Sequence, residues 1–385
     1  MERITESEIM SLLDAQGPDF LAFAVTPWHA HNLDATITKL KRERKIQRGI
    51  ILISPSDAGN VLISEAEFNS KSSVEIEFRL FKEKKRGAME NIVHKINVMR
   101  SVFSLGKLKN DAFYLISSRK PYYAILPYIS GEKYATGLVA ITYDEGLAMY
   151  MRSEKEWLIE TFGDKRKISY FIHYFQRVLL QTIYEKRLRK CSRYWDWGFL
   201  KKMGDQHYEI NTEIQPFLIE TLERYALHRQ IQPVNLGGKI LLLTQPYAEV
   251  DAINIDTERT VVKSVADVIS KFYPIVHKAH PRETLEDKYE GVQFERLDGL
   301  NGVSIETVLS ISKNKPVAAV GYTSTALVSL KMLWGIPAIS LINIMGNVEM
   351  SQAAKNDFED FRNSFGDMVL VPNDLEDLAH ELSSL

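Results

Sequence analysis

Short apolar runs separated by longer amphipathic stretches recur along this 385-residue chain, and they constrain its fold more than any other feature. Runs that are apolar almost throughout are typical of parallel strands whose two faces are covered by helices. The runs are FLAFAV, GIILIS, VEIEFRLF, AFYLIS and LVAITYDEG in the first half, and KILLLTQ, YPIVHKAHP, VAAVGYTS, IPAISLI and DMVLVP in the second. The pattern predicts an α/β fold in both halves.

The length of the chain predicts two domains, because 385 residues exceed the usual size of one hydrophobic core. Residues 165–228 space their apolar side chains at three and four, which is typical of amphipathic helices. Pro233 and two glycines then interrupt the pattern before the strand rhythm resumes. We therefore expect Rossmann-like domains over 1–235, with a helical extension, and over 236–385, with a last helix beginning near Asp374.

The composition argues against several classes of protein. With 48 basic and 50 acidic residues, net charge gives no reason to expect nucleic acid as a partner. The single cysteine, Cys191, cannot form an internal disulfide, which favours a reducing compartment such as the cytoplasm. No apolar run approaches the ~18 residues that cross a bilayer, and the first residues do not resemble a secretion signal.

The sequence also lacks the familiar cofactor and metal motifs. It contains no G-x-G-x-x-G, no G-x-x-x-x-G-K-[ST], no H-E-x-x-H and no D-x-D. The first two would predict dinucleotide or P-loop chemistry, and the last two a metal ion. We expect a protein that uses neither a cofactor nor a metal.

The first positive signal is the segment Y-D-E-G, which ends the run that starts at Leu138. It places Asp144 and Glu145 at the carboxyl end of a predicted strand, where ligands of parallel sheets bind, and Gly146 permits a tight turn. One carboxylate could act as a base while the other holds the turn. The alternative is an ordinary polar turn after a buried strand.

The second signal is the segment K-A-H-P-R-E, which follows another predicted strand. Pro281 restrains His280, so the imidazole is a positioned donor to a phosphate oxygen, and Lys278 and Arg282 make the surroundings cationic. His280 could stabilise the charge of a departing phosphate or give it a proton. The alternative is a histidine that caps a turn.

The third signal is the segment G-Y-T-S-T-A-L, where a predicted strand runs into hydroxyl residues and an apolar helix. Ser324, Thr325 and the free N–H groups of a helix N-terminus form an anion site. A Ser or Thr in this place can also serve as a simple helix cap, and both explanations can hold at once.

The ordered set DEG, K-x-HP and a Ser/Thr pair resembles the [DE]-[DE]-G, HP and S-[ST] motifs of bacterial sialyltransferases with GT-B folds, which include capsule polysialyltransferases and lipooligosaccharide sialyltransferases. The resemblance implies two Rossmann-like domains that face a central cleft. It also implies inverting, metal-independent transfer from CMP-sialic acid to a glycan. The first domain would then bind the acceptor and the second the donor.

The resemblance also implies roles for individual residues. Asp144 corresponds to the base, with Glu145 as the alternative, and His280 lies near the CMP phosphate. The implied CMP contacts are Lys278 at the cytosine, Glu306 at the ribose, and Pro281, Ser324 and Thr325 around the phosphate. In some lipooligosaccharide enzymes the base is instead an aspartate after the first strand of the second domain. The corresponding turn here offers Tyr247 and Glu249 but no aspartate, which favours the Y-D-E-G site and a polysialyltransferase-like enzyme.

Four basic runs in the first half are either solvated helix faces or contacts for an anionic glycan or lipid headgroups. Lys165, Arg166 and Lys167 are candidate acceptor contacts, and Trp28 could stack on a sugar or fill the core. We expect an anionic or galactose-containing glycan as acceptor, and a peripheral contact with the inner membrane or the capsule assembly machinery. The alternatives are a single-transfer lipooligosaccharide-type enzyme, a Kdo transferase that uses CMP-Kdo, and a non-catalytic glycan- or nucleotide-binding module.

Overall fold

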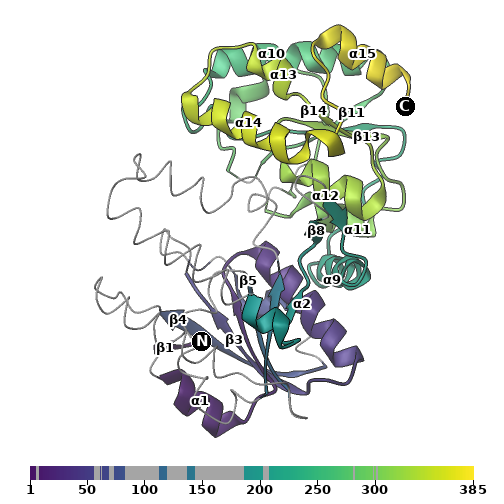
Figure 1. Cartoon of the computed structure of the whole chain (residues 1–385). Helices are drawn as coiled ribbons and strands as arrows, with labels where there is room; N and C mark the ends of the chain where they lie inside the picture. Colours follow the sequence, from purple (N-terminus) through teal and green to yellow (C-terminus); the bar gives the residue numbers. More distant parts are fainter. Residues whose placement is uncertain are drawn as a thin grey trace, which may run out of the picture. The chain divides into compact units, whose positions relative to one another are not determined.

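The structure is a computed structural model of the chain (Figure 1). It describes residues 1–5, 8–55, 61, 63–68, 73–82, 112–118, 137–143, 186–202, 208–280, 282–297, 299–300 and 302–385. The chain divides into two compact units, Met1–Lys201 with Asn211–Thr221, and Lys202–Ile210 with Leu222–Leu385. We call them unit 1 and unit 2. The division passes through helix α9 (Gln215–His228), and the boundary at residue 235 stays a prediction.

Unit 1 contains a seven-stranded parallel sheet in the order β1-β4-β3-β2-β5-β6-β7. Its strands are β1 (Glu2–Thr5), β2 (Phe20–Ala24), β3 (Arg48–Ile53), β4 (Glu75–Lys82), β5 (Phe113–Ser118), β6 (Leu138–Tyr143) and β7 (Tyr194–Asp196). The five strands β2 to β6 confirm the predicted apolar runs. The short strands β1 and β7 were not predicted.

The central strands of the unit 1 sheet are buried on both faces, which explains why β2, β5 and β6 are largely apolar. Leu21 and Phe23 of β2 pack in one core with Leu13 of α1 (Ile9–Gln16). The alternate residue Ala22 packs in a second core with Leu33 of α2 (Pro27–Arg42). The two helices therefore cover opposite faces of the sheet. A single 3-10 turn, η2 (Glu65–Glu67), follows β3.

Unit 2 contains a five-stranded parallel sheet in the order β12-β11-β10-β13-β14. Its strands are β10 (Ile240–Leu243), β11 (Ile275–Lys278), β12 (Glu295–Arg296), β13 (Ala318–Gly321) and β14 (Ala338–Ser340). The predicted run D-M-V-L-V-P does not form a strand. It contributes one bridge, from Leu370 to Ile339, because a 3-10 turn, η7 (Gly366–Met368), precedes it and Pro372 has no N–H to donate.

The helices of unit 2 start where the sequence supplies capping side chains. Asp374 caps α15 with its carboxylate, which confirms the helix predicted near that residue. The helices after α9 are α10 (Ile255–Ile269), η6 (Glu286–Tyr289), α11 (Ile305–Ile311), α12 (Thr325–Trp334), α13 (Ile342–Gly346), α14 (Gln352–Phe365) and α15 (Leu375–Ser383). Two short strands, β8 (Leu200–Lys202) and β9 (Tyr208–Ile210), pair separately. Within the described ranges, no helix has the length and hydrophobicity to cross a membrane.

The predicted α/β class with two Rossmann-like parts is confirmed. Both sheets are parallel, and the sequence alternates between strand and helix wherever the structure describes it. A cleft between the two units remains a prediction.

Candidate functional site

Three strands of unit 2 end side by side at the carboxyl edge of its sheet. The parallel register pairs Leu243 of β10 with Lys278 of β11 on one side and with Gly321 of β13 on the other. The K-A-H-P turn, the segment after β10 and the hydroxyl turn therefore start at the same edge. A Cβ atom on Gly321 would lie 2.8 Å from the carbonyl oxygen of Leu243, so only glycine allows this close approach.

His280 is half-buried in the turn after β11, and the turn itself fixes its ring. Its Nδ1 accepts a hydrogen bond from the N–H of Arg282 at 3.1 Å, and its carbonyl accepts one from Glu283 at 2.9 Å. Burial, together with the nearby charges of Arg282 and Lys278, lowers the pKa of His280 to about 4. The ring is therefore neutral at pH 7, and its proton lies on Nε2 because Nδ1 accepts. His280 does cap its turn, as one alternative predicted, yet it keeps Nε2–H as a donor.

Lys278 ends β11 as a buried cation at the same edge. Its Nζ donates to the carbonyl of Ala279 at 3.2 Å. Burial lowers the pKa of Lys278, although Glu306 and Glu283 oppose this effect. Glu306 lies in the first turn of α11 and accepts a hydrogen bond of 2.5 Å from Ser329 of α12. The structure thus leaves Lys278 and Glu306 close enough for their charges to interact.

The hydroxyl turn joins β13 to α12. Ser324 occupies the N-cap position of α12, but its side chain makes no capping hydrogen bond, so simple capping does not explain this serine. Thr325 is the first residue of the helix, and both side chains are half-buried. The neighbouring Thr323 is held by a 2.5 Å hydrogen bond to the hydroxyl of Tyr247. The N-terminus of a ten-residue helix with two hydroxyls beside it is suited to an anion.

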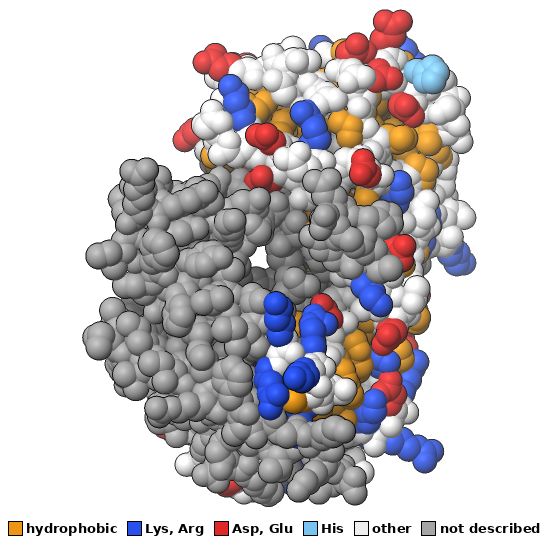
Figure 2. All heavy atoms as spheres, in the orientation of Figure 1, with side chains coloured by type: hydrophobic (Ala, Val, Ile, Leu, Met, Phe, Trp, Pro, Cys, Tyr) orange, Lys and Arg blue, Asp and Glu red, His pale blue; other side chains and the backbone are white. Residues whose placement is uncertain are grey.

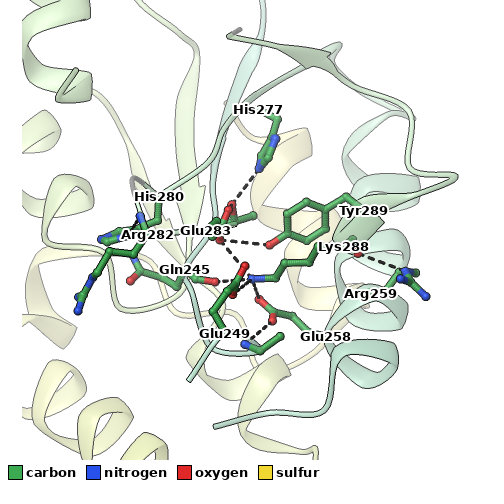
Figure 3. Close-up of polar contacts among 12 residues, drawn as sticks. Gln245, Glu249, Glu258, Arg259, His277, His280, Arg282, Glu283, Lys288 and Tyr289 are labelled. Carbon is green, nitrogen blue, oxygen red and sulfur yellow. Dashed lines mark hydrogen bonds and ion pairs between the residues drawn. The ribbon is translucent and has the colours of Figure 1, made fainter. Parts of the chain in front are cut away.

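A buried lysine that the sequence analysis did not identify lies beside this edge (Figure 3). The Nζ of Lys288, in η6, lies 2.7 Å from the carbonyl oxygen of Gln245. It also contacts three carboxylates: Glu249 at 3.0 Å, Glu258 at 3.1 Å and Glu283 at 3.3 Å. Burial lowers the pKa of Lys288, but the carboxylates outweigh burial and the net pKa is raised. The side chains therefore form one charged cluster, which we call the Lys288 cluster.

His277, three residues before His280, extends the Lys288 cluster. Its Nε2 lies 2.9 Å from the hydroxyl of Thr244, which donates to Glu283 at 2.8 Å. The hydroxyl proton points at the carboxylate, so His277 must donate from Nε2. Burial lowers the pKa of His277 to about 3, and the ring stays neutral. His277 is thus a structural histidine.

Several predicted residues lie outside the described residues: Asp144, Glu145 and Gly146, which follow β6 directly, Pro281, and Lys165, Arg166 and Lys167. Trp28 lies in the first turn of α2, half-buried, with its ring edge-to-face on Phe199 at 6.3 Å. Its neighbours His29 and His31 are both buried.

In the described part of the chain, no group of three or more His, Cys, Asp or Glu side chains is placed to hold a metal ion. The expectation of metal-free chemistry stays a prediction.

Comparisons with known proteins give one family. The family model described as "Alpha-2,8-polysialyltransferase (POLYST)" matches residues 20–343 of the chain. A search of curated proteins gives no match.

Several solved structures have a similar fold at low identity. An alpha-2,3-sialyltransferase from Photobacterium phosphoreum is 11% identical, with a TM-score of 0.45, over 93% of this chain and 98% of that one. A UDP-GlcNAc 2-epimerase from Methanocaldococcus jannaschii is 13% identical, with a TM-score of 0.49, over 95% and 92%. A Photobacterium 2,6-sialyltransferase solved with CMP and lactose is 11% identical, with a TM-score of 0.44, over 91% and 78%.

Proposed function

Because the chain belongs to the alpha-2,8-polysialyltransferase family, it is a sialyltransferase, and we propose that it takes sialic acid from CMP-sialic acid bound at the carboxyl edge of the unit 2 sheet. The observation that carries this proposal is the geometry of His280. The N–H of Arg282 fixes one ring nitrogen, so the other keeps a proton to donate, and the hydroxyl turn starts at the same edge of the sheet. Such an arrangement is suited to a phosphate whose negative charge grows as CMP leaves.

The proposed reaction is an inverting displacement. Asp144, or Glu145 in its place, accepts the proton of the acceptor hydroxyl, whose oxygen forms a bond to the anomeric carbon. The bond between that carbon and the phosphate oxygen breaks, and CMP leaves with the electron pair. Because the pKa of His280 is lowered to about 4, we favour a neutral hydrogen-bond donor over a proton donor for this residue. Ser324, Thr325 and the N–H groups of α12 stabilise the same charge.

The remaining CMP contacts follow from the family resemblance. Lys278 would lie beside the cytosine, Glu306 at the ribose, and Pro281 beside the phosphate. The burial of Lys278 and Glu306 supports a role in a site that is shielded from water, although Glu306 already accepts a hydrogen bond from Ser329.

For the acceptor we propose a long anionic glycan such as oligosialic acid of a capsule. Lys165, Arg166 and Lys167 are the candidate contacts, and the helical residues Lys186, Arg189 and Lys190 add exposed positive charge in the same unit. Figure 2 shows Lys and Arg side chains gathered on the described surface of unit 1. A peripheral contact with the inner membrane or capsule assembly machinery would use the same kind of charge.

The donor is tested by measuring CMP release from CMP-sialic acid and from CMP-Kdo, with lactosides and oligosialic acids as acceptors. We expect turnover with CMP-sialic acid, and His280→Ala should lower kcat by about 10²- to 10³-fold. His380→Ala, an exposed histidine of the same unit, is the matched control and should be fully active. Release from CMP-Kdo alone would show that the enzyme is a Kdo transferase. Because the family consists of enzymes, the non-catalytic module is set aside.

The acceptor is tested by measuring how KM for each acceptor changes with ionic strength. Exposed charge contacts weaken as ionic strength rises, since the Debye length is ~10 Å at about 0.1 M. The KM for oligosialic acids should rise with salt, whereas that for a neutral lactoside should not, and neutralising Lys165, Arg166 and Lys167 together should have the same effect. If lactosides react and oligosialic acids do not, the enzyme is of the single-transfer lipooligosaccharide type.

A further inference from the structure

We propose that Lys288 is a positioning residue of the donor site: its buried ammonium ties the turn that carries His280 to the segment after β10 and to helix α10. The proposal rests on the proposed function to the extent that His280 is taken to meet the donor phosphate. Lys288 touches no reacting group in this scheme. It acts through Glu283.

The first observation is where the groups that surround Lys288 come from. Gln245 and Glu249 belong to the segment after β10, Glu258 to α10 and Glu283 to the K-A-H-P-R-E turn. In Figure 3 the four groups converge on the lysine nitrogen from these separate segments. One ammonium therefore joins three separate segments at the unit 2 edge.

The second observation is how directly Glu283 connects to His280. The N–H of Glu283 donates to the carbonyl of His280 at 2.9 Å, which closes the turn. Its carboxylate accepts hydrogen bonds from Thr244 at 2.8 Å and from Tyr289 at 3.3 Å, in addition to the ion pair with Lys288. The backbone of Glu283 thus fixes the His280 turn, and its side chain is fixed in turn by the Lys288 cluster.

The third observation is burial. The side chain of Lys288 is 1% exposed, and those of Glu258 and Glu283 are 0% and 5% exposed. Taking such charges out of water costs nearly as much as their attraction returns, so a buried ion pair by itself adds little stability over apolar packing. Its directional contacts do, however, select one arrangement of the segments it joins. A donor site that must hold His280 in one orientation benefits from such a tie.

The charge of the cluster fits a fixed rather than a shifting arrangement. Three ionised carboxylates around one ammonium would leave excess negative charge in a buried place. Burial raises the pKa of Glu258 to about 7, so a proton on this carboxyl offsets part of the charge near neutral pH, and burial also raises the pKa of Glu283. His277 and Arg296 also face this region, and His277 stays neutral there.

The test compares two variants with a matched control. Lys288→Met removes the ammonium that joins the three segments. Glu283→Gln weakens only the link to the His280 turn and leaves two carboxylates and a carbonyl around Lys288. This second variant should therefore fold even if the first does not. Lys315→Met is the control, because the ammonium of Lys315 also bonds backbone carbonyls in unit 2, those of Leu309 and Ser312, at the far end of α11.

Hydrogen exchange and CMP binding are the two readouts. We expect the amides of Arg282 and Glu283 to exchange at least about 10-fold faster in both variants, and the Kd for CMP to rise about 10- to 100-fold, which is the cost of misplacing an aligned group. Lys315→Met should leave the exchange rates and the Kd for CMP unchanged, even where it loses as much thermal stability as the other two variants.

The outcomes separate the two proposals. If exchange and CMP binding in Glu283→Gln match those of Lys315→Met, the tie does not exist and the inference is wrong. Faster exchange with unchanged CMP binding overturns it as well, because the tie then does not serve the donor. If the wild type itself fails to bind CMP, the proposed donor is wrong, and the exchange rates still show whether Lys288 holds the turn.

Discussion

Each sheet contains a glycine at which no Cβ atom fits, and the two glycines lie at opposite ends of their strands. Gly49 is near the start of β3, paired with Phe20, and a Cβ atom there would lie 2.0 Å from the Phe20 ring. Gly321 is the last residue of β13, and its Cβ atom would lie 2.8 Å from the Leu243 carbonyl. The lack of a side chain therefore allows the core of unit 1 to pack at Gly49, and it allows β10 and β13 to approach at the carboxyl edge of the unit 2 sheet at Gly321.

Replacing Gly49 with alanine should have the largest effect on stability. The Phe20 ring is fully buried and cannot swing into solvent, so Gly49→Ala must shift β2 or distort the ring. We expect the free energy of unfolding to fall by about 3 kcal/mol, the upper end for overpacking, with no change in CMP affinity. Urea denaturation and CMP titration measure the two quantities. Gly302→Ala, in open space, is the control and should change stability by less than about 0.5 kcal/mol.

Replacing Gly321 with alanine should have a smaller effect on stability but should also affect binding. The obstacle is the backbone of Leu243, so we expect a loss of about 2 kcal/mol as the two strands separate. Because Leu243 leads into Thr244 and Gln245 of the Lys288 cluster, the Kd for CMP should rise about 10-fold. If Gly321→Ala loses stability but binds CMP normally, the close approach of β10 and β13 does not shape the donor site.

The comparison also separates what the sequence could predict from what it could not. Strands β2, β3, β5 and β6 were predictable because a strand buried on both faces is largely apolar, and β4 was predictable because its apolar residues alternate with polar ones. The strands β1 and β7 are too short and too mixed in composition to give that pattern. The places of His280 and Ser324 in turns after strands, and the cap by Asp374, were also predictable, since each depends on a few neighbouring residues at the end of an element.

The Lys288 cluster could not be predicted in the same way. Its members are spread from Gln245 to Lys288, and nothing in the sequence indicates that the fold brings them together. Lys288 itself stands in the polar segment L-E-D-K-Y-E, which is typical of a solvated helix face. The sequence shows Glu249 only as part of a turn that lacks the aspartate base of some relatives, whereas the structure places its carboxylate on Lys288. Contacts across the chain depend on topology, and local patterns do not specify topology.

Two buried groups, one in each unit, should make stability depend on pH in opposite directions. Burial lowers the pKa of His31 in unit 1 from 6.5 to about 4, so the unfolded chain binds more protons between these values and stability falls as pH falls. Burial raises the pKa of Glu258 in unit 2 from 4.5 to about 7, despite Lys288, so the folded chain binds more protons there and stability falls as pH rises. Each effect is at most ~1.4 kcal/mol per pH unit.

Urea unfolding at several pH values between about 5 and 6.5, the range that both groups share, measures these slopes for the wild type and for His31→Gln and Glu258→Gln. As pH rises, the free energy of unfolding should increase less steeply in His31→Gln than in the wild type. In Glu258→Gln it should increase more steeply than in the wild type, because the opposing contribution of Glu258 is removed. If both substitutions change the slope with the same sign, one of the two pKa directions is wrong.

The smallest difference concerns the caps of two helices, α2 after β2 and α10 after β10. The hydroxyl of Thr26 accepts one N–H at the start of α2, from His29 at 3.3 Å. The Oδ1 of Asn254 accepts two at the start of α10, from Asp256 at 2.9 Å and Thr257 at 3.4 Å. Replacing either cap by alanine costs about 0.5 to 2 kcal/mol, so we expect Thr26→Ala near the lower value and Asn254→Ala about 1 kcal/mol.

The two cap variants should differ more in binding than in stability. The first turn of α10 carries Glu258, whose carboxylate accepts the N–H of Ala248 at 3.1 Å and contacts Lys288. Fraying of this turn loosens one of the three segments that the Lys288 cluster joins, so Asn254→Ala should raise the Kd for CMP about twofold, whereas Thr26→Ala should leave it unchanged. Thermal unfolding and CMP titration on the same samples measure both effects. A greater loss of CMP affinity in Thr26→Ala than in Asn254→Ala would contradict the assignment of the donor to unit 2, because the only altered contact would then lie in the other unit.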